Sequence, residues 1–182
     1  MEVTASAGEK EQYRQANPGR FLVFPEDRSY PVRMKTDVPY KWLQGQDRSL
    51  FKGAAMPNEY YAFQLGIWAG NQELKSITYE TSGLKSGNNV IPAKAITCFN
   101  INGVNPLGKP FTKKVSLAPD AVQPLWFGVD LKADQPGGTY KGVIVVSDET
   151  GYAVPVDIEL KVSGKMLADR GDNELWRHSR LR

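Results

Sequence analysis

The stretch YAVPVDIELKV, residues 152–162, decides the fold class of this chain. Apolar and polar side chains alternate along it with a period of two, which places them on opposite faces of a β-strand. The charged residues Asp157, Glu159 and Lys161 share one face. The other face carries Tyr152, Val154, Val156, Ile158, Leu160 and Val162. The pattern predicts a strand with one face in a core and the other in solvent.

The sequence just before this strand predicts its partner. TYKGVIVVS, residues 139–147, is rich in β-branched residues, and the four residues DETG, 148–151, separate it from the last strand. Gly151 can adopt the positive φ that a tight turn needs, so the two strands are expected to form a hairpin.

Similar alternation recurs towards the N-terminus. YAFQLGIW, residues 61–68, and VQPLWFGVDL, residues 122–131, each carry an apolar stripe on one face, with Trp68 and Trp126 on the other. Weaker strand candidates are RFLVF (20–24), YPVRMK (30–35), LKSITYE (74–80), AKAITCF (93–99) and FTKKVSL (111–117). Eight or nine short strands with Gly/Pro turns, and no helix before residue 165, predict an all-β, antiparallel two-sheet β-sandwich of immunoglobulin or jelly-roll type.

Composition excludes several classes of protein. The chain has 182 residues, of which 41% are hydrophobic and 24% charged, as in an ordinary globular domain and not a membrane-spanning or disordered one. Its single cysteine, Cys98, and single histidine, His178, exclude an internal disulfide and a His/Cys metal site, and no cofactor is predicted. The net charge is +3, of which residues 165–182 supply +2, so the rest is near neutral and no nucleic-acid or membrane partner is predicted.

Three segments are predicted along the chain. Residues 1–20 are polar, lack the apolar region of a signal peptide and are a candidate disordered segment. Residues 21–164 form the sandwich. Residues 165–182 form a linker in which GDNELWRHSRLR, 171–182, predicts a short helix capped by Asp172. Two to three turns are not stable alone in water. The apolar linker residues are therefore expected to contact another domain: Leu175, Trp176 and Leu181.

The residues suited to catalysis or metal binding are few. Asp157 and Glu159 lie on one strand face about 7 Å apart, a separation that an inverting glycosidase uses. Solvated strand faces carry such pairs routinely, so no catalytic residue is predicted. The stretch DRGDNE, 169–174, is rich in oxygen ligands but lacks the order of a calcium loop, so no metal site is predicted. It also contains the tripeptide Arg-Gly-Asp, which some adhesion proteins present to integrins. A match of three residues arises easily by chance, so no adhesion site is predicted from it.

The aromatic side chains are the candidates for a binding surface. If the face opposite the apolar stripe is outside, Trp68 and Trp126 can stack on sugar rings or cover a neighbouring domain. Burial beneath a loop is the alternative reading of these two indoles. Trp42 and Tyr60 are candidates for the same carbohydrate or domain-interface contact.

Several stretches carry a resemblance to a known family. PNEYYAFQLGIWAGNQELKSITYETSGL, residues 57–84, resembles the opening strand motif of the N-terminal β-sandwich of bacterial proteins related to the exo-acting β-N-acetylgalactosaminidase family of glycoside hydrolases. In that motif Glu59 precedes Phe63 and Gln64, and Leu74 opens the next strand. The segment 98–146 and the tail 167–182 are similar to later parts of the same domain, so the resemblance covers about residues 53–182.

The resemblance implies an accessory domain without a catalytic centre. In such proteins the tail leads into a (β/α)8 barrel that carries the catalytic Asp-Glu pair, so no catalytic residue transfers to this chain. It implies a non-catalytic sandwich that packs on that barrel in the same polypeptide, in a secreted, periplasmic or cell-surface protein. An autonomous carbohydrate-binding module for a polysaccharide and a protein-binding adhesion sandwich remain as alternatives.

Overall fold

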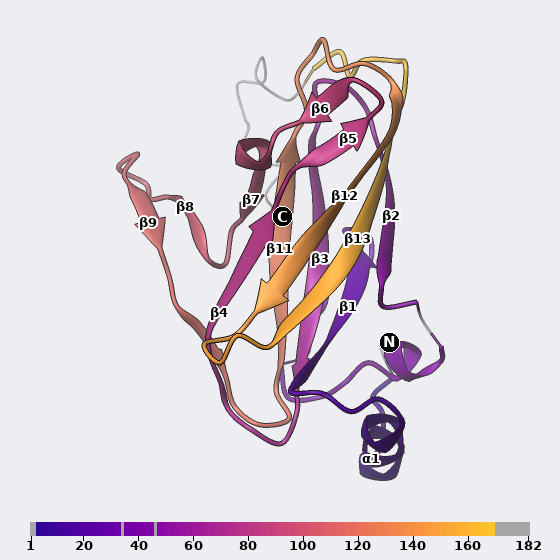
Figure 1. Ribbon diagram of the computed structural model, residues 1–182, viewed down its shortest axis with the longest axis vertical. Helices are drawn as coiled ribbons and strands as arrows, with labels where there is room; N and C mark the ends of the chain where they lie inside the picture. The colour runs from indigo at the N-terminus through magenta and orange to yellow at the C-terminus, as the bar shows by residue number, and fades with distance from the viewer. Residues whose placement is uncertain (1–2, 34, 46, 170–182) are drawn as a thin grey trace.

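Two β-sheets face each other across one apolar core in the computed structural model of the chain (Figure 1). The structure describes residues 3–33, 35–45 and 47–169. The first sheet has the order β1-β3-β11-β7, with the bounds β1 Phe21–Asp27, β3 Tyr60–Ala69, β11 Val122–Asp130 and β7 Ile96–Cys98. The predicted all-β sandwich is confirmed.

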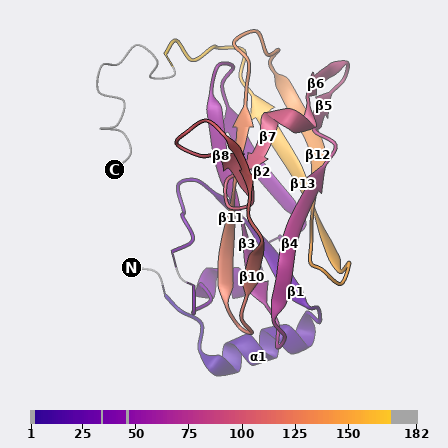
Figure 2. The ribbon, with the colours of Figure 1, turned by 90° about the vertical axis from the view of Figure 1, so that its left-hand side faces the viewer.

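The second sheet has the order β10-β4-β12-β13-β2. Its strands are β10 Val115–Leu117, β4 Leu74–Thr81, β12 Gly138–Ser147, β13 Ala153–Val162 and β2 Leu50–Ala55, and the short strands β5 Leu84–Ser86 and β6 Asn89–Ile91 extend it beside β12. Figure 2 shows the two sheets as separate layers. One pairing departs from the antiparallel prediction, because β2 runs parallel to β13.

The hairpin of β12 and β13 forms as the sequence predicts. The two strands pair antiparallel over their whole length, and Gly151 has a φ of 83° in the turn. Alternate residues of β13 are buried, including Val156, Ile158 and Leu160, whereas Asp157 and Lys161 are exposed. The period-two pattern therefore predicts correctly which face of β13 packs against the core.

An outer layer, residues 3–17, 28–33 and 35–45, covers the lower half of the first sheet on the side away from the core. It contains helix α1 (Ala7–Ala16) and the short helix η1 (Tyr40–Leu43). Together with the strands beneath, it forms a second apolar cluster of Ala5, Leu22, Phe24, Val32, Val38, Trp42, Trp68 and Val122. The first sheet is therefore buried on both faces at this end, where the period-two pattern predicts half-buried strands.

Helix α1 corrects the prediction that no helix precedes residue 165. The Ser6 hydroxyl accepts the Glu9 N–H, and the Glu9 carboxylate accepts the Ser6 N–H at 2.8 Å, which closes a capping box. The helix has no fully buried residue. Its sequence therefore lacks the apolar stripe by which an amphipathic helix is recognised. It lies across the lower end of the sandwich in Figure 2.

A β-hairpin that we call the arm, residues 101–114, stands away from the body on the left of Figure 1. It is made of β8 (Asn102–Val104) and β9 (Pro110–Thr112), which pair only with each other. The short helix η2 (Ala93–Ala95) and β7 precede it, and β10 follows it, so the arm joins an edge strand of one sheet to an edge strand of the other.

Two of the weaker strand predictions are wrong in detail. The predicted strand at 30–35 is absent from the described residues there, which belong to the outer layer. The predicted strand at 111–117 divides between β9 and β10. None of the helices in the described part of the chain has the length and hydropathy needed to cross a lipid bilayer.

Candidate functional site

The upper half of the first sheet leaves an aromatic surface on its outward face. The rings of Tyr60 on β3 and Phe99 after β7 lie 5.9 Å apart, and the two residues are 41% and 44% exposed. Gly128 of β11 lies between them, and a Cβ at that position would meet both rings. The absence of a side chain on Gly128 therefore leaves room for both aromatic rings over the strand. We call Tyr60, Phe99 and the backbone of Gly128 the aromatic face.

The turn before β3 fixes the position of Tyr60. The Glu59 carboxylate accepts the Met56 N–H at 2.9 Å and pairs with Arg28 at 2.6 Å, while Asn58 adopts a φ of 66°. These contacts hold the residues just before β3 in one conformation. Tyr61 packs in the core, and successive side chains of a strand point to opposite faces, so Tyr60 points outward.

The chain leaves the sandwich beside this same turn. The Leu167 N–H donates to the Pro57 carbonyl, and the Asn58 side-chain amide donates to the Leu167 carbonyl, both at 2.9 Å. At Leu167 the chain therefore lies against the turn that leads into Tyr60.

A groove of about 900 Å³ separates the aromatic face from the arm. Its walls combine aromatic rings with a few polar groups: Tyr60, Phe99, Phe111, Thr97, Asn102 and Lys94. The Tyr79 hydroxyl lies at its base, where it accepts the Cys98 N–H at 3.2 Å and bonds the Asn102 amide at 3.4 Å. These bonds attach the arm to both sheets, since Tyr79 belongs to β4 and Cys98 to β7.

The predicted tryptophans do not form a surface. Trp42 and Trp68 are fully buried in the cluster beneath the outer layer, so neither can touch a sugar or a neighbouring domain. Burial is the alternative that the sequence left open, and its cause is the outer layer, which no strand pattern predicts. Trp126 is half-buried on the outward face of β11. Of the predicted contacts only Tyr60 is well exposed, and Leu175, Trp176 and Leu181 lie outside the described residues.

Phe99 and the arm are missed by sequence reasoning, although the sequence holds a signal for them. The stretch INGVNPLGKPFTKK, 101–114, contains apolar and basic residues but no acid. A hairpin with this composition is a candidate interaction surface.

A polar network fastens α1 to the lower end of the first sheet. Asp120 has a φ of 62° between β10 and β11, and its carboxylate accepts from the Lys10 ammonium at 2.7 Å and the Trp68 indole N–H at 3.0 Å, besides pairing with Arg14. Partial burial acts to raise its pKa, but the bonds from Lys10 and Trp68 and the charge of Arg14 hold the pKa of Asp120 below its usual value.

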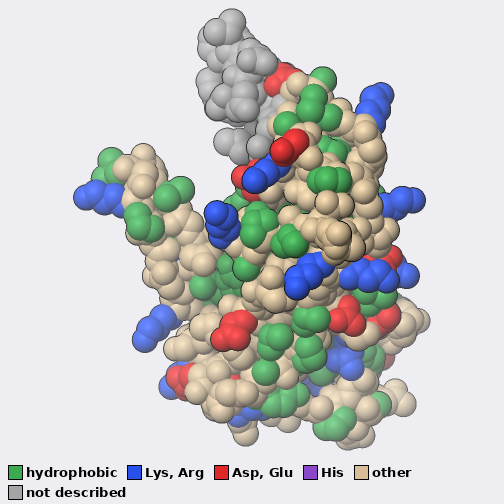
Figure 3. All heavy atoms as spheres, turned by 45° about the horizontal axis from the view of Figure 1, so that its top comes forward, with side chains coloured by type: hydrophobic (Ala, Val, Ile, Leu, Met, Phe, Trp, Pro, Cys, Tyr) green, Lys and Arg blue, Asp and Glu red, His purple; other side chains and the backbone are tan. Residues whose placement is uncertain are grey.

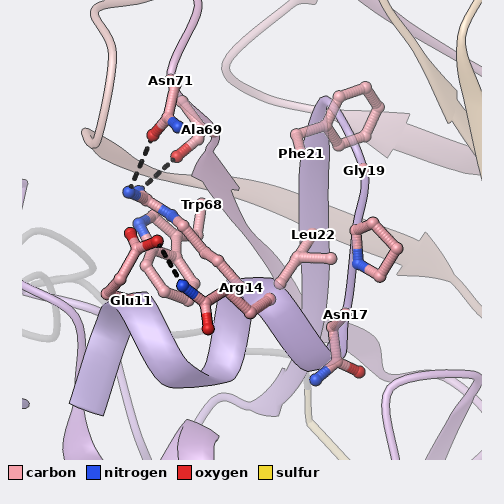
Figure 4. Close-up of a pocket in the computed structure, with 12 residues that line it drawn as sticks. Glu11, Arg14, Asn17, Gly19, Phe21, Leu22, Trp68, Ala69 and Asn71 are labelled. Carbon is pink, nitrogen blue, oxygen red and sulfur yellow. Dashed lines mark hydrogen bonds between the residues drawn. The ribbon is translucent and has the colours of Figure 1, made fainter. Parts of the chain in front are cut away.

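The small cavity beside this network is a structural feature of the helix contact (Figure 4). Arg14 crosses it 4.4 Å above the Trp68 ring and donates to the Asn71 side chain at 3.1 Å and the Ala69 carbonyl at 3.0 Å. The Arg14 donors are thus directed to the protein itself, and we assign the cavity no ligand.

The remaining titratable candidates are unsuited to catalysis. Glu159 pairs with Lys141 at 3.1 Å on the open face of the second sheet, with Asp157 exposed beside it. Burial raises the pKa of the Cys98 thiol to about 11, which keeps it protonated and unreactive. Among the described residues no group of three or more His, Cys, Asp or Glu side chains is arranged to hold a metal ion.

Comparison with known proteins supports the fold and leaves the family open. No family model matches the chain, and no curated protein matches it by sequence. A family 123 glycoside hydrolase from Clostridium perfringens is similar in structure, with a TM-score of 0.62 and 14% identity over 81% of this chain and 28% of that chain. The chain thus spans under a third of that enzyme.

Two further structural matches are too weak to support any inference about this chain. A DUF4466 family protein from Parabacteroides merdae has a TM-score of 0.37 and 10% identity over 80% of this chain and 46% of its own. A Bacteroides ovatus GH5 xyloglucanase has a TM-score of 0.33 and 10% identity over 63% of this chain and 17% of its own. At 14% identity even the family 123 enzyme shares only its fold with this chain.

Proposed function

We propose that this chain is a non-catalytic β-sandwich domain that supports a glycoside hydrolase catalytic domain in the same polypeptide, packing against it through the aromatic face. The observation that carries the proposal is the pair of exposed rings of Tyr60 and Phe99, of which Tyr60 follows the turn that Leu167 hydrogen-bonds. In the proposal a domain that follows residues 168–182 in the same polypeptide covers these rings, because large exposed apolar groups are the usual centre of such contacts.

The likeness to the family 123 enzyme supports the kind of partner. That enzyme hydrolyses glycolipid glycans, and this chain covers 28% of it, which is consistent with one domain of a larger protein. The family resemblance of residues 53–182 points to the same enzymes and to a location outside the cytoplasm. In this proposal catalysis belongs to the other domain, in agreement with the ion-paired, solvent-facing position of Glu159.

An autonomous carbohydrate-binding module is the second candidate, because the same two rings are able to stack on sugars. The geometry favours it less. The ring planes of Tyr60 and Phe99 are tilted by 32°, so they do not form one flat platform for a sugar chain. The Arg-Gly-Asp tripeptide at 170–172, on which the adhesion alternative depends, lies outside the described residues.

The test compares this 182-residue chain with the longest polypeptide that its own reading frame encodes. Hydroxyl-radical footprinting measures the oxidation of Tyr60 and Phe99 in each, with Tyr30, 64% exposed on the outer layer, as the control ring. Strong protection of Tyr60 and Phe99 only in the longer polypeptide is expected, together with hydrolysis of N-acetyl-β-galactosaminides by the longer polypeptide alone.

Two results would reject the proposal. One is a reading frame without a further domain, and the other is equal oxidation of the two rings in both polypeptides. A glycan array separates the second candidate, because a carbohydrate-binding module retains specific binding in the 182-residue chain and loses it in a Tyr60→Ser, Phe99→Ser variant.

A further inference from the structure

The arm exposes apolar side chains at a place where the fold gives them no cover. Val104 and Leu107 are 68% and 80% exposed near its tip. Two-stranded ribbons are marginally stable in water by themselves. Figure 3 shows the arm as a projection that bears hydrophobic and basic side chains, set apart from the body.

The arm is also the centre of a charge asymmetry that the net charge hides. Residues 81–119 contain five lysines, no arginine and no Asp or Glu, a charge of +5 in a chain whose total is +3. The remainder of the chain is therefore at −2. Three of these lysines belong to the arm, namely Lys109, Lys113 and Lys114, and Lys94 lines the groove beside it. None of the ion pairs found among the described residues involves any of the five.

The tip of the arm is held in a fixed shape before any partner arrives. The Asn105 side-chain oxygen accepts the N–H groups of Leu107 and Lys109, both at 3.0 Å, and the Asn105 N–H donates to the Lys109 carbonyl at 2.8 Å. Gly108 supplies the positive φ of 73° that this turn needs. A preformed loop loses little conformational entropy on binding, which favours a binding role for Leu107.

We propose that the arm and the groove form a docking site for an acidic protein surface. An apolar side chain of the partner enters the groove between Phe99 and Phe111, and its carboxylates pair with the arm lysines. This inference deepens the proposed function, because it gives the chemistry of the surface that the catalytic domain presents.

Two other occupants fit the arm less well. A sugar chain could stack on the aromatic rings of the groove, but it would leave the aliphatic side chains of Val104 and Leu107 at the tip without an apolar partner. A second copy of this chain would bring like-charged arms together if it bound through the same surface, which is unfavourable.

The experiment selects peptides from a phage library of random dodecapeptides on the folded 182-residue chain. The affinity of each selected peptide is then measured for the chain and for two double variants. Lys109→Ser, Lys114→Ser removes two arm charges and spares Lys113, whose ammonium lies 5.4 Å from the Phe111 ring. Lys52→Ser, Lys161→Ser removes two exposed charges from β2 and β13 and is the matched control.

The selected peptides are expected to combine Asp or Glu with a large apolar residue. The arm variant should bind them more weakly by about two- to fivefold per lysine removed, and the control variant should bind them as the unchanged chain does. Binding should also weaken between 0.1 M and 1 M salt, since the screening length falls from about 10 Å to about 3 Å. Leu107→Ser tests the apolar part and should weaken binding at both salt concentrations.

Selected peptides without acidic residues, or with equal affinity for the arm variant, would overturn the inference. So would binding of heparin or polygalacturonate to the arm in the absence of any acidic peptide binding. If acidic peptides bind the arm while Tyr60 and Phe99 stay unprotected in the longer polypeptide, the docking site stands and the proposed catalytic-domain partner does not.

Discussion

Replacement of Asp120 tests whether the polar network at the lower end holds the outer layer in place. Asp120→Gly removes all three side-chain contacts and keeps a residue that accepts the φ of 62°. The Trp68 N–H then loses its partner, which costs about 1–3 kcal/mol when the group is buried. The two ion pairs add about 0.2–1 kcal/mol each, because the Asp120 side chain is 41% exposed and the pairs are screened by water.

The total destabilisation expected for Asp120→Gly is about 1.5–3 kcal/mol, with the Trp68 cost taken near its lower end because water can reach the site. For a domain of this size, that corresponds to a fall in Tm of about 3–12 °C. Asp120→Asn retains an acceptor for Trp68 and loses only the charge, so its expected cost is about 0.5–1 kcal/mol. Urea unfolding followed by tryptophan fluorescence and far-ultraviolet circular dichroism measures both variants.

The pH dependence gives the sharper test. The pKa of Asp120 lies below its ordinary value of 3.8 in the folded chain, so its ionised form stabilises the fold above that pH and this contribution disappears as pH falls through the folded pKa. The difference between the unchanged chain and Asp120→Asn should therefore be full at neutral pH and shrink below about pH 4. Asp134→Asn, at an exposed position beyond the other end of β11, is the control. The proposed role of Asp120 would be refuted by a stability difference that does not depend on pH. It would also be refuted if Asp120→Gly were as stable to urea as Asp134→Asn.

The other predictions concern close packing and thiol reactivity. Gly66→Ala should destabilise the fold by about 1–3 kcal/mol in urea unfolding, because its Cβ would lie 2.5 Å from Cη2 of the buried Trp42 ring; an unchanged midpoint would contradict this packing. Gly128→Ala should cost less than about 1 kcal/mol, because the rings it displaces are half exposed, but should raise the oxidation of Tyr60 by radicals; unaltered oxidation would mean that the aromatic face does not depend on this glycine. Cys98 should react with a disulfide reagent only when the chain unfolds, since its pKa is raised to about 11, and fast reaction of the native chain would contradict its burial.

The inward faces of the strands could be predicted from the sequence because burial on one side leaves a period-two record. The apolar stripes of β3, β11 and β13 all point into the core as predicted. The hairpin of β12 and β13 was equally predictable, because a short loop with a glycine determines a local pairing.

The outer layer could not be predicted in the same way, although two local signals for it exist. FLVF, residues 21–24, is continuously apolar, which is typical of a strand buried on both faces. Ser6 and Glu9 have the spacing of a capping box. Neither signal says what covers the strand or where the helix lies, because the contacts of Trp42 and Trp68 depend on the tertiary fold.

The candidate site was predictable only in part. Tyr60 lies on the outward face by its register in β3, and that follows from the sequence. Its pairing with Phe99 requires β11 to lie between β3 and β7, and strand order is a long-range property of the fold. The lysine-rich arm is visible in the sequence as a stretch without acids, but its projection from the body is not.

The parallel pair of β2 and β13 has a consequence for how the chain acquires its structure during synthesis. Leu50 pairs with Asp157 and Ala55 with Val162, so β2 leaves the ribosome long before the strand it needs. Until then the edge of β2 and the inner faces of β1 and β3 are exposed in the nascent chain, which favours aggregation. Contacts of such long sequence separation also slow folding, and closure of the second sheet is expected to be a late, rate-limiting event. A nascent chain stalled before residue 153 should accordingly bind chaperones. It should also be cleaved by proteases to which the complete domain is resistant.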